Sequence, residues 1–291
     1  MECMDRKGNK FMQDETQNKI LKFLYKNLCG RIILKQLIKP WVTKLSEHVM
    51  NSPCSRIFIP LFIKKYNIDM GEYENRTYSS YNDFFTRKIK KGRRQIDPYP
   101  KHLIAPCDAK LSVYPINKDS QFTIKNTTYT LSSLLRNKKL ADFYEDGTLL
   151  IFRLTVDDYH RYCYIDSGRK SKNYRIKGVF HTVNPIANDL VPVYKENTRE
   201  YSILHSENFG KILIMEVGAL LVGRIVNYHE EAYVKRGQEK GRFEFGGSTI
   251  IVCLEKDRAV IDNDIVQNSL KGIETLVKMG EKIGLAPENI Q

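Results

Sequence analysis

The chain has 291 residues, of which 42% are hydrophobic and 28% are charged. This length is enough to bury one large core or two modest ones, and the composition excludes an intrinsically disordered chain and a fibre. The formal net charge of +13 predicts attraction to an anionic partner, such as nucleic acid, an anionic bilayer surface or a phosphorylated substrate.

The six cysteines form no C-x-x-C pair and no close Cys/His cluster. The sequence therefore indicates neither a structural zinc site nor a disulfide framework, and we expect reduced thiols in a cytoplasmic setting. No apolar run approaches the roughly 18 residues that a membrane-spanning helix needs. The start of the chain does not read as a secretory signal, and no nucleic-acid-binding motif is recognisable. We expect a protein that can touch a membrane but does not cross it.

Residues 1–18 are polar and are expected to form a frayed leader, whereas residues 19–100 are expected to form a helical region. The start of this region predicts an amphipathic helix with a basic opposite face. Two interpretations stay open: a helix packed on the body with solvated lysines, or a helix that docks on a membrane surface. Apolar residues recur in it at helical spacing, with lysines between them: Ile20, Leu24, Leu28 and Ile32.

Pro40 is expected to end or kink this first helix. Further helical segments are predicted in SRIFIPLFIKKYNIDM and at the start of SSYNDFFTRKIKKGRRQIDPYP. The second of these runs into a basic connection bounded by prolines, which is typical of a solvated surface.

From about residue 101 the sequence changes to short β-rich segments separated by polar turns, including KLSVYPI, TLLIFRLTV and GRFEFGGSTIIVCLE. This spacing predicts an antiparallel sheet, a sandwich or a barrel. The expected fold class is therefore α+β, in which a basic, amphipathic helical region precedes a β-rich catalytic body with an antiparallel sheet or barrel-like form. The body covers residues 101–291 and acts with the helices as one functional unit.

Inside this body, Gly246 and Gly247 precede Ser248 in the middle of a strand-like segment. One interpretation is a β-bulge or hairpin in which the glycines supply positive φ angles. The other is self-cleavage, in which the Ser248 hydroxyl attacks the carbonyl before it and turns the amide into an ester. β-Elimination would then cut the chain and turn the serine remnant into a pyruvoyl group. The tetrapeptide alone favours the bulge.

Self-attack needs a base for the serine and a group that orients the base. The candidates are His160, which follows an apolar run in VDDYHRYCYIDSG, and Asp108, which lies in a turn that enters a strand in APCDAKLSVY. Taken singly, each is typical of a turn or a satisfied polar residue.

Several motifs occur together in one order: NDFFTRKIK, DYHR, VNPIA, HSENFGKILIMEVGALLVG and FGGST. In these motifs the chain resembles the phosphatidylserine decarboxylases, particularly the bacterial subgroup with a Gly-Gly-Ser-Thr cleavage motif. The resemblance covers roughly residues 80 to 285. It favours self-cleavage over the bulge.

The resemblance implies a proenzyme that cuts itself between Gly247 and Ser248 into a large chain, 1–247, and a small chain, 248–291. The two chains would form a heterodimer that can dimerise further. The cofactor would be the pyruvoyl group derived from Ser248, with no metal, and its ketone would act as an electron sink. The reaction would convert phosphatidylserine to phosphatidylethanolamine at an anionic membrane. We expect peripheral association with the cytoplasmic face of the cell membrane and no nucleic-acid partner.

The resemblance also implies roles for single residues. Ser248 matches the pyruvoyl precursor, Asp108 the acidic member of the self-cleavage triad, and His160 the first histidine of a His-x-x-His motif, suited to proton transfer. The substrate-binding positions implied by the resemblance are two glycines that let backbone approach the site, and an Asn-x-Arg stretch: Gly218, Gly223, Asn197 and Arg199.

Two positions depart from the family pattern. Cys163 stands where many members have the second histidine, and Ala109 stands where they commonly have glycine. If that histidine is the base, its loss affects self-cleavage, so His160 is ranked first as the base, His181 second and Cys163 third. The substitution at Cys163 also motivates an alternative function, an uncleaved homologue that binds anionic lipid without catalysis.

Overall fold

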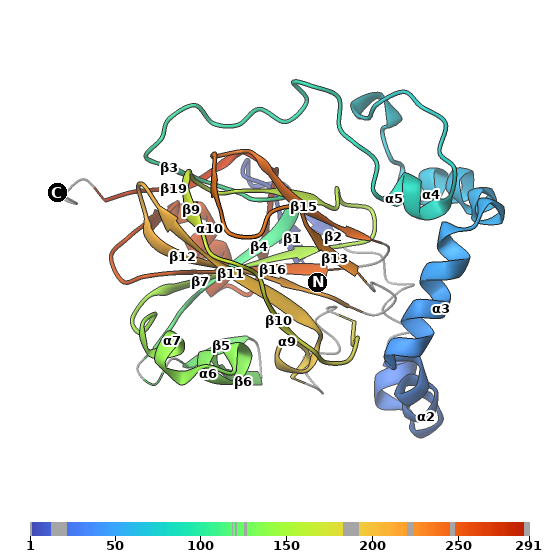
Figure 1. Ribbon diagram of the computed structural model, residues 1–291, viewed down its shortest axis with the longest axis horizontal. Coiled ribbons are helices and arrows are strands. Elements are labelled where there is room, and N and C mark those ends of the chain that lie inside the picture. The colour runs from blue at the N-terminus through green and yellow to red at the C-terminus, as the bar shows by residue number, and fades with distance from the viewer. Residues whose placement is uncertain are drawn as a thin grey trace.

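The structure is a computed structural model that describes residues 2–12, 22–117, 119, 121–124, 127–182, 192–219, 224–244 and 248–287. It contains a β-rich body with a group of helices along one side (Figure 1). The predicted α+β class is confirmed. The helices before residue 100 are α2 (Leu28–Leu37), α3 (Pro40–Asn51), η1 (Pro53–Ile57), α4 (Phe58–Tyr66), η2 (Met70–Glu72) and α5 (Tyr81–Phe85).

The predicted helices before residue 100 are present. α2 ends at Leu37, and Pro40 occupies the first turn of α3. Proline suits this position because the first N–H groups of a helix have no acceptor within the helix. The expected interruption at Pro40 is therefore confirmed. No helix in the part of the chain that the structure describes is long and apolar enough to cross a membrane.

The helical side exposes an unusual amount of apolar surface. Leu28 is 74% exposed and Ile32 64% exposed, although their spacing is that of a packed helix face. Leu34 and Tyr25 point the other way and are buried in the core. We call the exposed apolar set the apolar face: Leu28, Ile32, Ile33, Trp41, Leu45, Val49, Ile57, Phe58 and Leu61.

The body is built on an 11-stranded sheet with the order β14-β9-β11-β12-β16-β7-β4-β18-β1-β2, and β10 pairs with β11. Its pairs are antiparallel except β1 with β18. Among the described residues the sheet runs open from β14 to β2, so the barrel-like form is not found. The strands are β1 (Glu2–Met4), β2 (Lys10–Met12), β4 (Ala109–Pro115), β7 (Thr148–Leu154), β9 (Gly168–Lys170), β10 (Tyr174–Ile176), β11 (Arg199–Ser206), β12 (Gly210–Val217), β14 (Ala232–Val234), β16 (Ser248–Leu254) and β18 (Glu274–Val277).

Smaller sheets and short helices complete the body. A three-stranded sheet β13-β15-β8 lies beside the main sheet and carries the chain toward β16. The short helices were not predicted, because four to eight residues give too little periodicity to separate helix from turn. The remaining elements are β3 (His102–Ile104), β5 (Gln121–Ile124), β6 (Thr127–Thr130), β8 (Arg161–Cys163), β13 (Arg224–Asn227), β15 (Glu239–Glu244), β17 (Val260–Ile261), β19 (Lys282–Leu285), α6 (Leu131–Leu135), α7 (Lys138–Asp142), α9 (Val193–Glu196) and α10 (Asn263–Leu270).

The central strands β7, β12 and β16 are nearly continuous apolar runs, TLLIFRL, GKILIMEV and STIIVCL. Every residue of β16 is buried, so this strand is covered on both faces. Both edges of β16 are also paired, with β12 on one side and β7 on the other. The strand that begins with Ser248 is therefore part of the hydrophobic core.

Residues 2–12 differ from the expected frayed leader. β1 and β2 form a hairpin that joins the main sheet through β18. Cys3 is buried, and Arg6 donates to the carboxylates of Asp262 and Asp264. The burial of Cys3 and the ion pairs of Arg6 stabilise this segment, although its polar composition predicted a frayed leader.

Candidate active site

Ser248 lies at one end of the main sheet, between two neighbouring strands. It is the first residue of β16 and pairs with Leu154, the last residue of β7. On the other side Thr249 pairs with Val217, the last residue of β12. Gly218 follows Val217, so continuing this register brings Gly218 next to Ser248. The structure thus brings together the predicted serine and one of the two predicted glycines.

The Ser248 hydroxyl is buried and has no hydrogen-bond partner among the described residues. The neighbouring Thr249 hydroxyl is also buried without a hydrogen-bond partner among the described residues. A buried polar atom without a partner costs free energy, so such atoms are rare in folded proteins and often belong to functional sites. No described side chain or backbone group therefore holds the hydroxyl of Ser248 in a hydrogen bond.

His160 lies at the same end of the sheet. The chain leaves β7 at Leu154 and reaches His160 six residues later, before β8. The carbonyl of His160 accepts a hydrogen bond of 2.9 Å from the backbone N–H of Phe243, on the strand that leads toward Ser248. Two segments that flank the serine thus meet at this histidine.

The His160 ring is buried and holds a defined tautomer. Nδ1 lies 2.9 Å from the carbonyl oxygen of Asp158, which can only accept a hydrogen bond. Nδ1 therefore carries the proton, and Nε2 has a free lone pair. Nε2 has no partner among the described residues. Burial lowers the pKa of His160 to about 4, so the ring is neutral at neutral pH.

The turn before His160 is held by an ion pair. Lys110 on β4 donates to the Asp158 carboxylate at 2.6 Å and to the Thr155 hydroxyl at 2.5 Å. The backbone N–H of Thr155 also donates to Asp158, at 2.7 Å. Lys110 holds the pKa of the Asp158 carboxyl below its usual value although burial opposes this. These bonds fix the carbonyl that orients His160.

Asp108 also lies at this end of the sheet, because it directly precedes β4. One strand, β7, lies between β4 and β16, so the position of Asp108 is two strand spacings, about 10 Å, from Ser248. Its carboxylate accepts hydrogen bonds from Arg94 at 2.6 and 2.9 Å and from the backbone N–H of Met279 at 2.8 Å. Among the described contacts of Asp108, none joins it to His160 or Ser248.

The two alternative bases have different surroundings. Cys163 is buried, its N–H donates to the Pro106 carbonyl at 2.8 Å, and burial raises the pKa of its thiol to about 12. His181 contacts the Tyr25 hydroxyl through Nδ1 at 3.1 Å and the Glu196 carboxylate through Nε2 at 3.6 Å. A protonated thiol is a poor base, and both ring nitrogens of His181 have neighbours.

Asn197 and Arg199 make internal contacts. The side-chain oxygen of Asn197 accepts a hydrogen bond from the backbone N–H of His181. Its side-chain nitrogen donates to the carbonyl of His181 and, at 2.8 Å, to the carbonyl of Gly218. Arg199 donates to four backbone carbonyls, those of Ser133, Leu134, Lys195 and Asn197. These contacts support the backbone around Gly218, and a substrate-binding role for either side chain stays a prediction. Gly223 and Gly247 lie outside the described residues.

The sequence of this chain matches a family of known proteins over the segment that builds the site. Residues 81–285 match the family model described as phosphatidylserine decarboxylase. Phosphatidylserine decarboxylase proenzyme 2 of Clostridium acetobutylicum is 48% identical over 275 residues, which cover 94% of both chains. The proenzymes of Clostridium botulinum strain 657 and Desulfitobacterium hafniense strain Y51 are 42% and 39% identical, covering 91% and 97% of this chain, and 92% and 97% of their own.

The chain belongs to the phosphatidylserine decarboxylase family. The resemblance drawn from the motifs is confirmed, and so is the expectation of an enzyme of this class. The matched segment begins at Tyr81, at the start of α5, and includes all of the main sheet except β1 and β2. Helices α2, α3 and α4 precede it.

Two residues of this family member were not singled out from the sequence. Lys110 follows the predicted Asp108 by two positions, and Arg87 ends the FFTR part of a motif that supported the resemblance. A buried cation is invisible in a sequence, because lysine and arginine are mostly exposed. Their place inside apolar motifs is the signal that could have found them.

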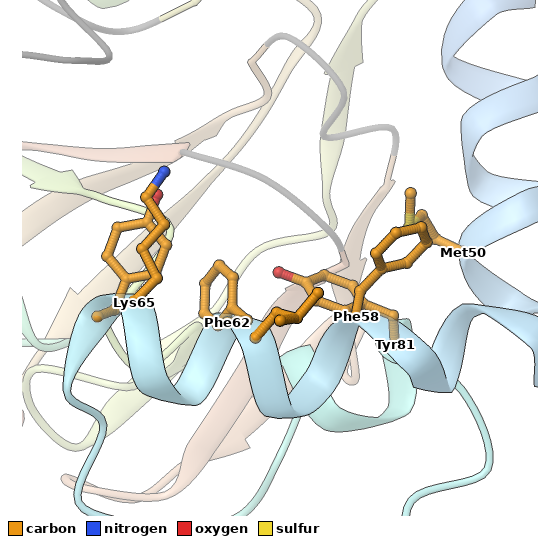
Figure 2. Close-up of a pocket in the computed structure, with 7 residues that line it drawn as sticks. Met50, Phe58, Phe62, Lys65 and Tyr81 are labelled. Carbon is orange, nitrogen blue, oxygen red and sulfur yellow. The ribbon is translucent and has the colours of Figure 1, made fainter.

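An apolar pocket lies on the helical side, between α4 and its neighbours (Figure 2). Its volume is about 320 Å³. Tyr81 of α5 forms part of its wall, and α5 also carries Phe85, whose ring lies 4.1 Å from the His160 ring. One short helix thus contacts both the pocket and the site. The lining residues are Met50, Phe58, Leu61, Phe62, Lys65, Tyr66 and Tyr81.

Proposed function

We propose that this chain decarboxylates phosphatidylserine to phosphatidylethanolamine after cutting itself between Gly247 and Ser248. The observation that carries the proposal is a pair of buried atoms at one end of the sheet that have no partner among the described residues, Ser248 Oγ and His160 Nε2. The family membership supports the same reaction, since the relatives bear the name of this decarboxylase and of a proenzyme.

Self-cleavage begins with the serine hydroxyl. Oγ of Ser248 bonds to the carbonyl carbon of Gly247, the C–N bond between the residues breaks, and an ester with a free amine results. Loss of the Ser248 Cα proton then expels the Gly247 carboxylate and leaves a dehydroalanine. Its tautomer is hydrolysed with release of ammonia, which leaves a pyruvoyl group at the new end. No oxidant is needed, because each step is an addition, an elimination or a hydrolysis.

His160 is the base that we assign to this step. Its neutral ring and free Nε2 lone pair can accept the proton of the Ser248 hydroxyl. The Cys163 thiol carries its proton at neutral pH, and His181 is tied to Tyr25 and Glu196. These surroundings favour His160 over both alternatives.

We assign Asp108 to self-cleavage as an acidic group that acts at a distance from Ser248. Its bonds to Arg94 and Met279 connect the start of β4 to the segment after β18. Loss of its charge would leave the buried Arg94 without its main partner.

The end of β16 fits a pyruvoyl group derived from Ser248. The position is fully buried, and β16 is hydrogen-bonded to β12 on one side and β7 on the other, so the sheet would hold the group. Such a group supplies a carbonyl that takes up the electrons released as carbon dioxide leaves. Nε2 of His160 could take up a proton from the substrate ammonium and deliver it to the substrate carbon after that loss.

The two chains produced by the cut would stay together as a heterodimer. The segment 248–291 contributes β16 and β18, and each lies between two strands of the segment 1–247. Strand β16 alone has seven residues paired with β7. Separation of the chains would expose the core of the main sheet.

The apolar face and the positive charge support peripheral binding to an anionic membrane from the cytoplasmic side. Exposed leucine, isoleucine and tryptophan side chains can enter the acyl region, and nearby lysines attract anionic head groups at about 1 kcal/mol each. The pocket at α4 shares Phe58 and Leu61 with the apolar face, and Lys65 is among its lining residues (Figure 2). The membrane would thus bring the lipid substrate to the side of the protein on which α5 contacts His160.

Intact mass of the purified protein tests the proposal. We expect two fragments that end at Gly247 and begin at residue 248, with the smaller one lacking an Edman-reactive amine, and carbon dioxide release from phosphatidylserine vesicles. Ser248→Ala should leave one uncut chain of normal stability and no activity. A wild-type chain that stays uncut and binds vesicles without turnover would instead support the non-catalytic lipid-binding alternative.

A further inference from the structure

Arg87 is a fully buried cation beside the candidate active site. It directly follows the FFT sequence at the end of α5. Its Nη2 donates to the Tyr73 hydroxyl at 3.2 Å and to the carbonyl of Asp157 at 3.3 Å. The guanidinium carbon lies 4.3 Å from the centre of the Tyr73 ring and 4.9 Å from that of Phe84. Two aromatic rings therefore hold the group in a fixed place.

The guanidinium keeps donors that no described residue uses. Nε and Nη1 of Arg87 are buried and have no acceptor in the described part of the chain. An arginine has five N–H bonds, one on Nε and two on each terminal nitrogen, so three of them have no acceptor among the described residues. Within the same residues no carboxylate lies within 4.0 Å of Arg87.

Other buried arginines of this fold are compensated. Arg94 pairs with Asp108 at 2.6 Å, Arg153 pairs with Glu274, and Arg199 has four backbone carbonyls. Burial of a charge costs free energy unless an opposite charge or a full set of hydrogen bonds repays it. Arg87 has only the two aromatic faces and the two acceptors of Nη2, so among the described residues its environment is incomplete without an anion.

The segment that carries Arg87 packs against the segment that carries His160. Three contacts join the segment 85–87 to the segment 157–161. The Phe85 and His160 rings lie 4.1 Å apart, Arg161 donates to the carbonyl of Thr86 at 2.9 Å, and Arg87 donates to the Asp157 carbonyl. The N–H groups of Arg87 that have no described acceptor thus belong to the segment that packs against His160.

We propose that Arg87 binds an anionic oxygen of the substrate head group, through the N–H groups of Nε and Nη1. This inference rests on the proposed function, because it takes the anion from the phospholipid that reacts near His160. A head group with a phosphodiester and a carboxylate offers two such anions. Guanidinium recognises both by charge-assisted hydrogen bonds.

The two anions predict different effects. The phosphodiester is unchanged by the reaction, so a contact with it stabilises substrate and transition state equally and affects KM without affecting kcat. The carboxylate is lost as carbon dioxide, so a contact with it strengthens binding of the substrate but not of the product. The identity of the anion can therefore be read from binding alone.

The test uses three water-soluble probes in calorimetric titrations of the purified protein. Glycerophosphoserine carries both anions, glycerophosphoethanolamine only the phosphate, and O-methylserine only the carboxylate. We compare wild type with Arg87→Met, which keeps much of the side-chain length without charge, and with Arg87→Lys. The matched control is Arg76→Met, since Arg76 is exposed, lies 4.8 Å over the Tyr78 ring and pairs with Asp83.

We expect Arg87→Met to weaken glycerophosphoserine binding at least tenfold, Arg87→Lys to recover part of it, and Arg76→Met to leave it unchanged. An equal loss for glycerophosphoethanolamine assigns the phosphate, whereas a loss for O-methylserine assigns the carboxylate. Affinities within twofold of wild type for all three probes would overturn the proposal, and so would a wild type that binds none of them. Thermal unfolding of each variant identifies a merely structural role, which lowers stability without changing probe affinity.

Failure of this inference is distinguishable from failure of the proposed function. Titration needs no turnover, so it reports on Arg87 even in a chain that releases no carbon dioxide. If Arg87→Met does not fold, Arg87→Lys is compared with wild type, because it keeps the cation and loses the planar guanidinium. In the active enzyme, a phosphate contact predicts a tenfold higher KM at unchanged kcat for short-chain phosphatidylserine.

Discussion

The neutral state of His160 predicts a specific dependence of stability on pH. The ordinary pKa of histidine is 6.5, and burial lowers that of His160 to about 4. Between these values the unfolded chain binds a proton that the folded chain does not, so stability falls as the pH falls from 6.5 to about 4. At pH 4.5 the loss due to this one residue is about 2.5 kcal/mol relative to pH 8.

Urea unfolding of two variants at pH 8 and pH 4.5 measures this loss. Both variants carry Ser248→Ala, so that each is one uncut chain, and one also carries His160→Gln. Other titrating groups are the same in both, so the difference between their pH dependences isolates His160. We expect the glutamine variant to lose about 2.5 kcal/mol less between the two values of pH. Equal losses would show that His160 is not a buried neutral base.

The same lowered pKa predicts how the rate of the proposed self-cleavage depends on pH. The wild-type rate should be nearly constant from pH 8 to pH 5, because Nε2 of His160 stays unprotonated over this range. His160→Gln should slow cleavage by about 100-fold or more, the usual effect of losing a general base. Pulse labelling followed by a denaturing gel measures both. A tenfold fall in the wild-type rate between pH 6.5 and pH 5 would contradict the reasoning.

Three further substitutions test the surroundings of the site and the role of the apolar face. Lys110→Met leaves the Asp158 carboxylate buried without its cation, so we expect slower cleavage and a loss of about 3 kcal/mol in the free energy of unfolding by urea. The control Lys256→Met removes an exposed ion pair and should cost less than about 0.5 kcal/mol. Equal losses in the two variants would refute the role of Lys110. Cys163→Ser should keep cleavage within about twofold on a denaturing gel, because the thiol is protonated at neutral pH; loss of cleavage would restore the cysteine as base. Trp41→Asp, at a tryptophan that is 57% exposed, should lower sedimentation with anionic vesicles by about tenfold, and unchanged sedimentation would argue against docking through the apolar face.

The sequence by itself determined the class of fold, the family and the bond proposed for cleavage. Helical spacing, Pro40 and short β-rich runs are local patterns, so they predicted the helices before residue 100 and the strands after it. Ordered motifs such as DYHR and FGGST carried the resemblance that the comparisons confirm. Local composition misled at residues 2–12, where pairing with β18 outweighs the polar character of the segment.

Only the tertiary structure decided which buried polar atoms have no partner among the described residues. Ser248 and His160 are 88 positions apart in the chain, and the register of β16 with β7 and the bond from Phe243 bring them to one end of a sheet. The sequence listed three candidate bases, but burial and hydrogen bonding distinguish them, since both depend on neighbours that are distant in sequence. The unused donors of Arg87 are equally invisible in one dimension, because whether a cation is paired depends on how the chain folds around it.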